Sequence, residues 1–216
     1  MPKRLLTLAL TLGFLAAAAP ARAEFETIKL AQPDFNAQGL TVIQALKSRK
    51  SDRAFAEREL SLEHLSEALW AAGGINRPEK EGRTAPTANN LQAIEIFAVT
   101  RDGTYRYDPP SHELRPLTPG DNRASAGSQA YVATAPLNII YAADLNKLRG
   151  DDQDKRRIAA LDVGHFSENV YLYCASAGLN IVTRISIDPE ALAPLLKLDG
   201  NFLILMGQTV GYPPDK

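Results

Sequence analysis

A long helical repeat in the second half of the chain most constrains how this chain can fold. Apolar and small residues recur every three or four positions from Asp151 to Ala177, and Gly178 follows where such a helix would end. Ile94 to Val99 is apolar on both faces and predicts a central strand, and the turn at 102–103 predicts a hairpin with the next strand. Hairpin-linked strands mixed with helices, without strict βαβ alternation, indicate an α+β fold.

The rest of the pattern predicts shorter elements. Residues 24–38 form an extended lead-in, and residues 78–87 and 119–121 are loops rich in helix and strand breakers. Helices are predicted over 40–47, over 62–72 with Ser61 as N-cap and Trp70 in the core, and over 189–196. The remaining strands are predicted over 104–107, 137–142, 180–187 and 202–206, the last ending at Gly207.

The first 23 residues have the pattern of an export signal. Lys3 and Arg4 precede a mostly apolar run from Leu5 to Ala19, and the small residues around Arg22 fit a cleavage site. The run is shorter than the roughly 20 residues that span a bilayer. We therefore expect residues 1–23 to be a cleaved signal peptide and residues 24–216 to form one soluble domain that is periplasmic or otherwise exported. An uncleaved N-terminal anchor is the alternative.

Charge and cysteine content exclude several classes of function. The formal net charge of −1 argues against nucleic-acid binding, which needs a basic excess. Cys174 is the only cysteine, so an internal disulfide, a cysteine-built zinc site and a CxxC redox pair are excluded. Since Cys174 lies within the long helical repeat, it is expected to be a small buried core residue.

Common catalytic and metal-binding signatures are also missing. The chain has no nucleophile-elbow, Walker or dinucleotide-binding glycine pattern. Asp162, His165 and Glu168 fall near one face of the long helix and could ligate a metal. Their spacing is not that of a recognised metal signature, so a structural or solvent-facing role is favoured and no metal site is predicted.

Two polar stretches have the chemistry that a phosphorylated planar cofactor needs. Residues 49–53 contain Arg49, Lys50, Ser51 and Arg53, which are cations and a hydroxyl suited to a phosphate. Residues 86–92 concentrate short hydrogen-bonding side chains suited to ribityl hydroxyls and ring edges. A basic cluster alone is more often a solvated face, so the order of the two stretches along the chain carries the argument.

That order resembles the flavin-dependent nitroreductase superfamily. The family opens with R-[RK]-S-x-R-x-F, matched by residues 49–55, and later shows P-[ST]-x-x-N-x-Q, matched by residues 86–92. Residues 105–117 look like the segment typical of its SagB/ThcOx-type branch, whose members include azoline oxidases. Further similar positions are Asp162, Asn169, Gly178, Leu179, Gly207 and the run Gly211, Tyr212, Pro213. The resemblance covers about residues 40–214.

The resemblance implies a central, mostly antiparallel sheet flanked by helices, and a homodimer with two shared FMN sites. Arg49, Ser51 and Arg53, helped by Lys50, would hold the FMN phosphate and the polar edge of the ring. In the family, a segment of the opposite subunit reaches the flavin. Pro86, Thr87, Asn90 and Gln92 of this sequence match that segment.

The stretch Val182 to Ser186 would lie beside the flavin ring, with Thr183 and Ile185 as contacts. Arg184 departs from the small or apolar residue usual there, and it would either meet an anionic substrate or point to solvent. We leave these two roles for Arg184 open.

The sequence thus predicts an exported, FMN-dependent oxidoreductase that transfers hydride or electrons between a donor and a small organic or peptide substrate. Export makes a quinol, a redox protein or the substrate itself a better donor than NAD(P)H. The alternatives are a flavin-binding protein without turnover and an interaction module without cofactor.

Overall fold

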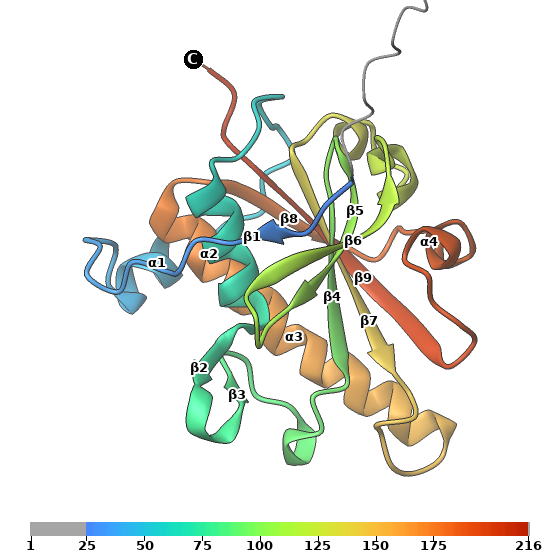
Figure 1. Ribbon diagram of the computed structural model, residues 1–216. Coiled ribbons are helices and arrows are strands. Elements are labelled where there is room, and N and C mark those ends of the chain that lie inside the picture. The colour runs from blue at the N-terminus through green and yellow to red at the C-terminus, as the bar shows by residue number, and fades with distance from the viewer. Residues whose placement is uncertain (1–24, 216) are drawn as a thin grey trace, which may run out of the picture.

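The computed structural model describes residues 25–215, which form a seven-stranded antiparallel sheet with helices on both faces (Figure 1). The strand order across the sheet is β1-β6-β5-β4-β7-β9-β8. The strands of the sheet are β1 (Ile28–Lys29), β4 (Ile94–Val99), β5 (Gly103–Asp108), β6 (Glu113–Pro119), β7 (Leu137–Asp144), β8 (Asn180–Arg184) and β9 (Phe202–Gly211). The expected signal peptide, residues 1–23, lies outside the described residues.

The helices begin and end where the sequence predicts. They are α1 (Val42–Ser48), α2 (Leu62–Gly73), α3 (Asp152–Ala177) and α4 (Pro189–Leu195). Ser61 accepts a hydrogen bond from His64 N at the start of α2, and Asp151 accepts one from Asp154 N at the start of α3. Gly178 ends α3 at φ 69°, a left-handed conformation that favours glycine. Among the described residues, no helix is both long enough and apolar enough to cross a membrane.

Alternation along the central strands divides the core into two layers. In β4, Ile94, Ile96 and Ala98 face the layer that α2 and α3 cover, and Phe97 and Val99 face the layer that α4 covers. All six residues of β4 are buried, which confirms the prediction of a central strand. Cys174 is completely buried against the first layer, as expected. The α3 face of the sheet therefore forms the larger part of the core.

Four segments differ from the predictions. Strand β8 ends at Arg184, three residues before the predicted end at residue 187. The loop predicted over 78–87 contains part of a small hairpin of β2 (Ile75–Arg77) and β3 (Gly82–Arg83). Strand β6 lies in a segment for which the sequence predicted no strand. It tolerates its prolines because it pairs on one side only with the two-residue β1. Strand β9 continues past Gly207 to Gly211, because Gly207 pairs with both Ile140 and Arg184.

A buried histidine fastens the lead-in segment to the sheet. His112 is 5% exposed, and its Nε2 lies 2.8 Å from the Ala31 carbonyl while its Nδ1 lies 2.8 Å from the Tyr107 hydroxyl. These partners suit a neutral ring that donates from Nε2 and accepts at Nδ1. Burial lowers the pKa of His112 below its usual value.

This burial predicts a pH-dependent stability. Because the folded-state pKa is depressed, the unfolded chain binds the extra proton first, so stability should fall as pH decreases from about 7 to about 5. His112→Asn, which tolerates the observed φ of 50°, should cost about 1–3 kcal/mol at pH 7 through lost hydrogen bonds and should flatten this pH dependence. Urea unfolding measured across this pH range checks the result. The exposed His165→Asn should keep the wild-type slope, and an unchanged slope in His112→Asn would contradict the assignment.

Candidate functional site

The basic stretch leaves α1 as an extended segment anchored to α3. Arg49 is the C-cap of α1, and its guanidinium carbon lies 5.3 Å from the ring centroid of Tyr171. Ser51 Oγ lies 2.7 Å from the Tyr171 hydroxyl, which also accepts a hydrogen bond of 2.9 Å from the backbone N–H of Thr183. Tyr171 thus joins the basic stretch to β8, and it places Arg49, Ser51 and Thr183 in one site.

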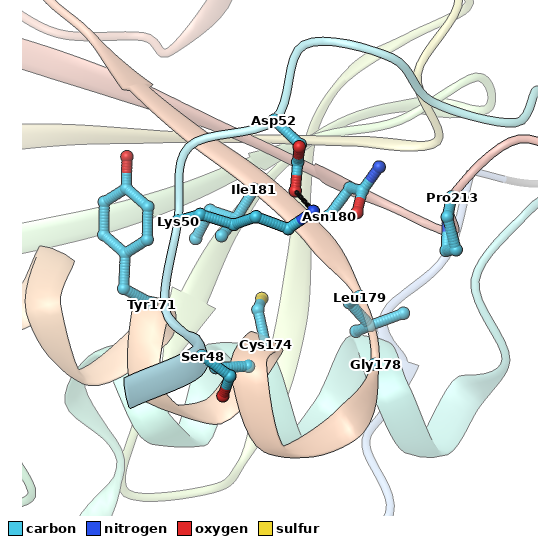
Figure 2. A pocket seen from close by; sticks show the side chains of 11 residues that line it. Ser48, Lys50, Asp52, Tyr171, Cys174, Gly178, Leu179, Asn180, Ile181 and Pro213 are labelled. Carbon is cyan, nitrogen blue, oxygen red and sulfur yellow. Dashed lines mark ion pairs between the residues drawn. The ribbon is translucent and has the colours of Figure 1, made fainter. Parts of the chain in front are cut away.

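Lys50 and Asp52 face a cavity whose wall also includes Tyr171. Alternate side chains of an extended segment point in opposite directions. The Lys50 ammonium lies 3.2 Å from an Asp52 carboxylate oxygen, and both residues line a cavity of about 300 Å³ with Cys174 and Asn180 (Figure 2). Arg49, Ser51 and Arg53 do not line this cavity. Lys50 is therefore paired with Asp52, although its side chain is 73% exposed, and its role as a helper of the two arginines stays a prediction.

The two arginines of the stretch carry uncompensated charge. Within residues 25–215, neither Arg49 nor Arg53 has a carboxylate within ion-pair distance. Arg53 is exposed, and Arg49 is half-buried against Tyr171. Guanidinium groups of this kind form strong, often bidentate hydrogen bonds with phosphate. The segment can therefore bind an anion without first breaking an ion pair.

A buried polar network fixes β8 next to the basic stretch. Gln208 Nε2 donates to Thr183 Oγ1 at 3.0 Å and to Ser167 Oγ at 3.0 Å, and Gln208 Oε1 accepts from the Tyr141 hydroxyl at 2.6 Å. Ile185 follows β8 and is 83% exposed. An apolar side chain held on a rigid strand end beside free cations can cover one face of a planar ring.

Arg184 requires a correction. Its side chain is 6% exposed, so it does not point to solvent. The guanidinium donates to the Ala126 carbonyl at 2.5 Å, to Asn138 Oδ1 at 2.8 Å and to Thr209 Oγ1 at 3.3 Å. Burial lowers its pKa to about 10. Because its neighbours in β8 alternate to the opposite side, Arg184 holds the strands together instead of reaching a substrate.

The second polar stretch is held in a strained conformation by α3. Asn89, Asn90 and Gln92 have φ values of 51°, 54° and 50°, in the left-handed region, which asparagine tolerates and which costs free energy at Gln92. The backbone N–H of Ala88 donates to the buried Asp162 carboxylate at 3.0 Å, and Gln92 Nε2 donates to the Glu81 carbonyl at 2.8 Å. The exposed Asn89 and Asn90 are therefore presented on a fixed loop.

Within one chain, the two polar stretches do not meet. Residues 49–53 are anchored at Tyr171 and residues 86–92 at Asp162, both on α3. Nine residues separate these anchors, which places them about 14 Å apart and on opposite sides of the helix. A single subunit therefore presents two half-sites that face in different directions.

The three helix residues considered as metal ligands have separate environments. Asp162 is buried and holds the loop at Ala88, and His165 and Glu168 are exposed. Burial is the largest influence on Asp162 and raises its pKa. In the part of the chain that the structure describes, no group of three or more His, Cys, Asp or Glu residues has metal-binding geometry. Asp162 thus acts on the loop at residues 86–92.

Comparison with known proteins identifies the family. The model of the nitroreductase family matches residues 46–212. The chain belongs to the nitroreductase family. A crystal structure of a protein from Ralstonia eutropha described as a nitroreductase has a TM-score of 0.82 and 35% identity, covering 88% of this chain and 91% of that chain. A nitroreductase-like protein of Methanocaldococcus jannaschii is 29% identical over 84% of this chain and 96% of its own length.

The NADPH:FMN oxidoreductase of Vibrio harveyi, solved with NAD⁺, shares the fold at a TM-score of 0.61 and 21% identity, covering 81% of this chain and 69% of that chain. These comparisons confirm the predicted α+β nitroreductase fold. They also agree with the span of the resemblance, since the matched residues include both polar stretches.

Sequence reasoning missed two residues of this candidate site. Tyr171 and Gln208 connect the basic stretch, β8 and β9, but neither lies in a family motif used above. Tyr171 does lie on a buried stripe with Ser167 and Cys174 at helical spacing. The sequence did contain a signal for this role, because Ser167 and Tyr171 place a hydroxyl group on two successive turns of that buried stripe.

Arg184→Lys tests the structural role of the buried guanidinium. One ammonium group cannot reach Ala126, Asn138 and Thr209 together, so unfolding free energy should fall by about 1–3 kcal/mol. Urea denaturation measures the change. Arg106→Lys, whose partner is Glu95 and whose side chain is half exposed, should cost at most about 1 kcal/mol. Equal stability of Arg184→Lys and wild type would show that the guanidinium does not hold these strands.

Proposed function

We propose that this nitroreductase-family protein is an FMN-dependent oxidoreductase. One observation supports the proposal most strongly. The Tyr171 side chain contacts the Arg49 guanidinium, Ser51 Oγ and the backbone N–H of Thr183, and so brings the basic stretch next to β8. An unpaired cationic segment therefore adjoins a rigid strand end with an exposed apolar residue. A flavin mononucleotide has the matching parts, a phosphate and a planar ring.

The donor set fits the phosphate end of FMN. Arg49 and Arg53 offer charge-assisted donors, and Ser51 offers a hydroxyl. Because the Tyr171 hydroxyl already accepts from Thr183 N–H, its own hydrogen is best placed on Ser51 Oγ, which frees the Ser51 hydroxyl to donate to a ligand. With Lys50 paired to Asp52, the selectivity for phosphate rests on the two arginines.

Thr183 and Ile185 would lie along the ring. When bound, FMN supplies the hydride or electron transfer chemistry. The protein orients the ring through the fixed end of β8, limits water on the face that Ile185 covers, and neutralises the phosphate. The polar network through Gln208 keeps Thr183 in place during these events. The substrate is a small organic molecule or a peptide, in keeping with the resemblance of residues 105–117 to the SagB/ThcOx-type branch.

The same proposal includes a homodimer with shared sites. The half-sites of one subunit face opposite sides of α3, so a two-fold partner is needed to bring Thr87, Asn90 and Gln92 to the flavin. Exposed apolar side chains also favour a protein interface: Ile43 of α1 is 74% exposed and Leu161 of α3 is 65% exposed. Pro86 is the first residue of the loop that would contribute Thr87, Asn90 and Gln92 to the partner's flavin site.

Export and the electron donor are also part of the proposal. The proposal of export is supported only by the pattern of residues 1–23, which resembles a signal peptide. In an exported location, a quinol or a redox protein is the more available donor.

The selective loss of FMN in Arg49→Ala tests the cofactor assignment. Wild type should bind about one FMN per chain, and Arg49→Ala should weaken FMN by about 2–3 kcal/mol because a charge-assisted phosphate contact is lost. Riboflavin, which has no phosphate, should bind both proteins about equally. Quenching of flavin fluorescence measures all four affinities. Lys50→Ala is the matched control and should change FMN affinity less, since Lys50 is paired with Asp52. No FMN binding by wild type would reject the proposal.

A mixed dimer tests whether each site needs both subunits. Co-expression of Arg49→Ala and Asn90→Ala chains with different tags should give heterodimers with one intact site and one doubly altered site. These heterodimers should bind about one FMN per dimer tightly, whereas either homodimer should bind both flavins weakly. Light scattering and flavin absorbance provide the readouts. A monomer that still binds FMN tightly would contradict the shared site.

A further inference from the structure

A second hollow lies on the other side of the helical layer from the Tyr171 site. It has a volume of about 430 Å³ and lies between α2, the last turns of α3 and the lead-in at residues 33–39. Tyr173 lines it, and Tyr173 points to nearly the opposite side of α3 from Tyr171 because two residues turn a helix by about 200°. The hollow is thus distinct from the proposed flavin site. Its volume is within the usual range for small-molecule sites.

Aromatic side chains form much of its wall. Trp70 from α2, Tyr173 from α3 and Phe35 from the lead-in all line the hollow. The Phe35 and Trp70 rings meet edge to face with their centroids 5.5 Å apart. Trp70 was expected in the core, but it is only half-buried. Phe35 is 75% exposed, so its ring is accessible to a ligand in the hollow.

The charged side chains that line the hollow are two carboxylates, beside the polar Gln38, His64 and Ser176. Glu67 accepts a hydrogen bond of 3.0 Å from the Tyr173 hydroxyl, and Asp34 also lines the hollow. No lysine or arginine lines it, and Glu67 has no ion-pair partner within residues 25–215. His64 also faces the hollow, with its Nδ1 3.0 Å from the Tyr212 hydroxyl. Glu67 is half-buried and also accepts a hydrogen bond of 3.4 Å from the backbone N–H of Asp34, but no cation balances its charge among the described residues.

We propose that this hollow binds a small organic cation of the alkylammonium class. The carboxylate of Glu67 would pair with the ammonium group, and the faces of Trp70 and Phe35 would contact its alkyl substituents by cation–π attraction. Ring faces carry a negative electrostatic potential and thus favour a cation over a neutral molecule of the same shape. The charge and the aromatic lining therefore select the same class of ligand.

The chain contains one tryptophan, so intrinsic tryptophan fluorescence reports directly on this hollow. The experiment titrates the purified protein, with its natural complement of cofactor, with choline and with 3,3-dimethyl-1-butanol, which replaces the ammonium nitrogen by carbon. Choline should shift the Trp70 emission saturably, with an affinity at least about tenfold higher than that of the neutral alcohol. Isothermal titration calorimetry provides an independent affinity.

Two variants assign the binding to the named residues. Glu67→Gln keeps an acceptor for Tyr173 and should weaken choline at least about tenfold, with little effect on the neutral alcohol. Phe35→Ala removes an exposed ring and should weaken choline without lowering thermal stability. Glu63→Gln, on the exposed side of α2, should leave choline affinity unchanged.

Three results would overturn the proposal. The first is no choline binding, and the second is equal affinity for choline and the neutral alcohol. The third is a Trp70 emission that changes with protein concentration and not with choline, because this would show that a second copy of the chain covers the hollow. The flavin assignment does not depend on any of these outcomes, since it rests on residues outside the hollow.

Discussion

The packing of α3 across the sheet is the contact on which the rest of the molecule depends. The helix has 26 residues and a length of about 39 Å, so it crosses β4, β7 and β9 with one buried stripe. Each functional segment is then fastened to a different side of this helix. Asp162 holds the loop at residues 86–92, Tyr171 holds the basic stretch and β8, and Tyr173 closes the acidic hollow. Loops that would otherwise be mobile are thereby given fixed positions.

Buried polar groups set the shape of the proposed flavin site. Gln208 and Arg184 are both buried, and each connects several segments through hydrogen bonds. An unpaired buried donor or acceptor costs about 1–3 kcal/mol, so the segments around these side chains have few alternative arrangements. Burial is more costly for Arg184, because its charge has no carboxylate partner among the described residues. Its depressed pKa reflects this cost. Burial thus converts a residue that looked like a substrate contact into a support for the strand beside it.

The arrangement of half-sites gives a physical reason for a shared site. Residues that contribute to one ligand site must converge, but the anchors of the two polar stretches are on opposite sides of one rigid helix. Rotating either stretch toward the other would break its contact with Asp162 or Tyr171. In the proposed homodimer, a two-fold partner would bring the two stretches together without such a change. The exposed Ile43 and Leu161 would provide apolar area for that contact.

The local elements and the family could be predicted from the sequence alone. Helical periodicity and caps located α2 and α3 within one or two residues, and alternation identified β4 as central, because these signals depend on neighbours along the chain. The two motifs also indicated the nitroreductase family, which the match over residues 46–212 confirms. Side-chain direction could not be predicted in the same way. The burial of Arg184, the contacts of Tyr171 and the acidic aromatic hollow depend on residues far apart in sequence. The packing of α3, the strands and the loops decides which of these groups meet, because burial and distance are properties of the folded chain.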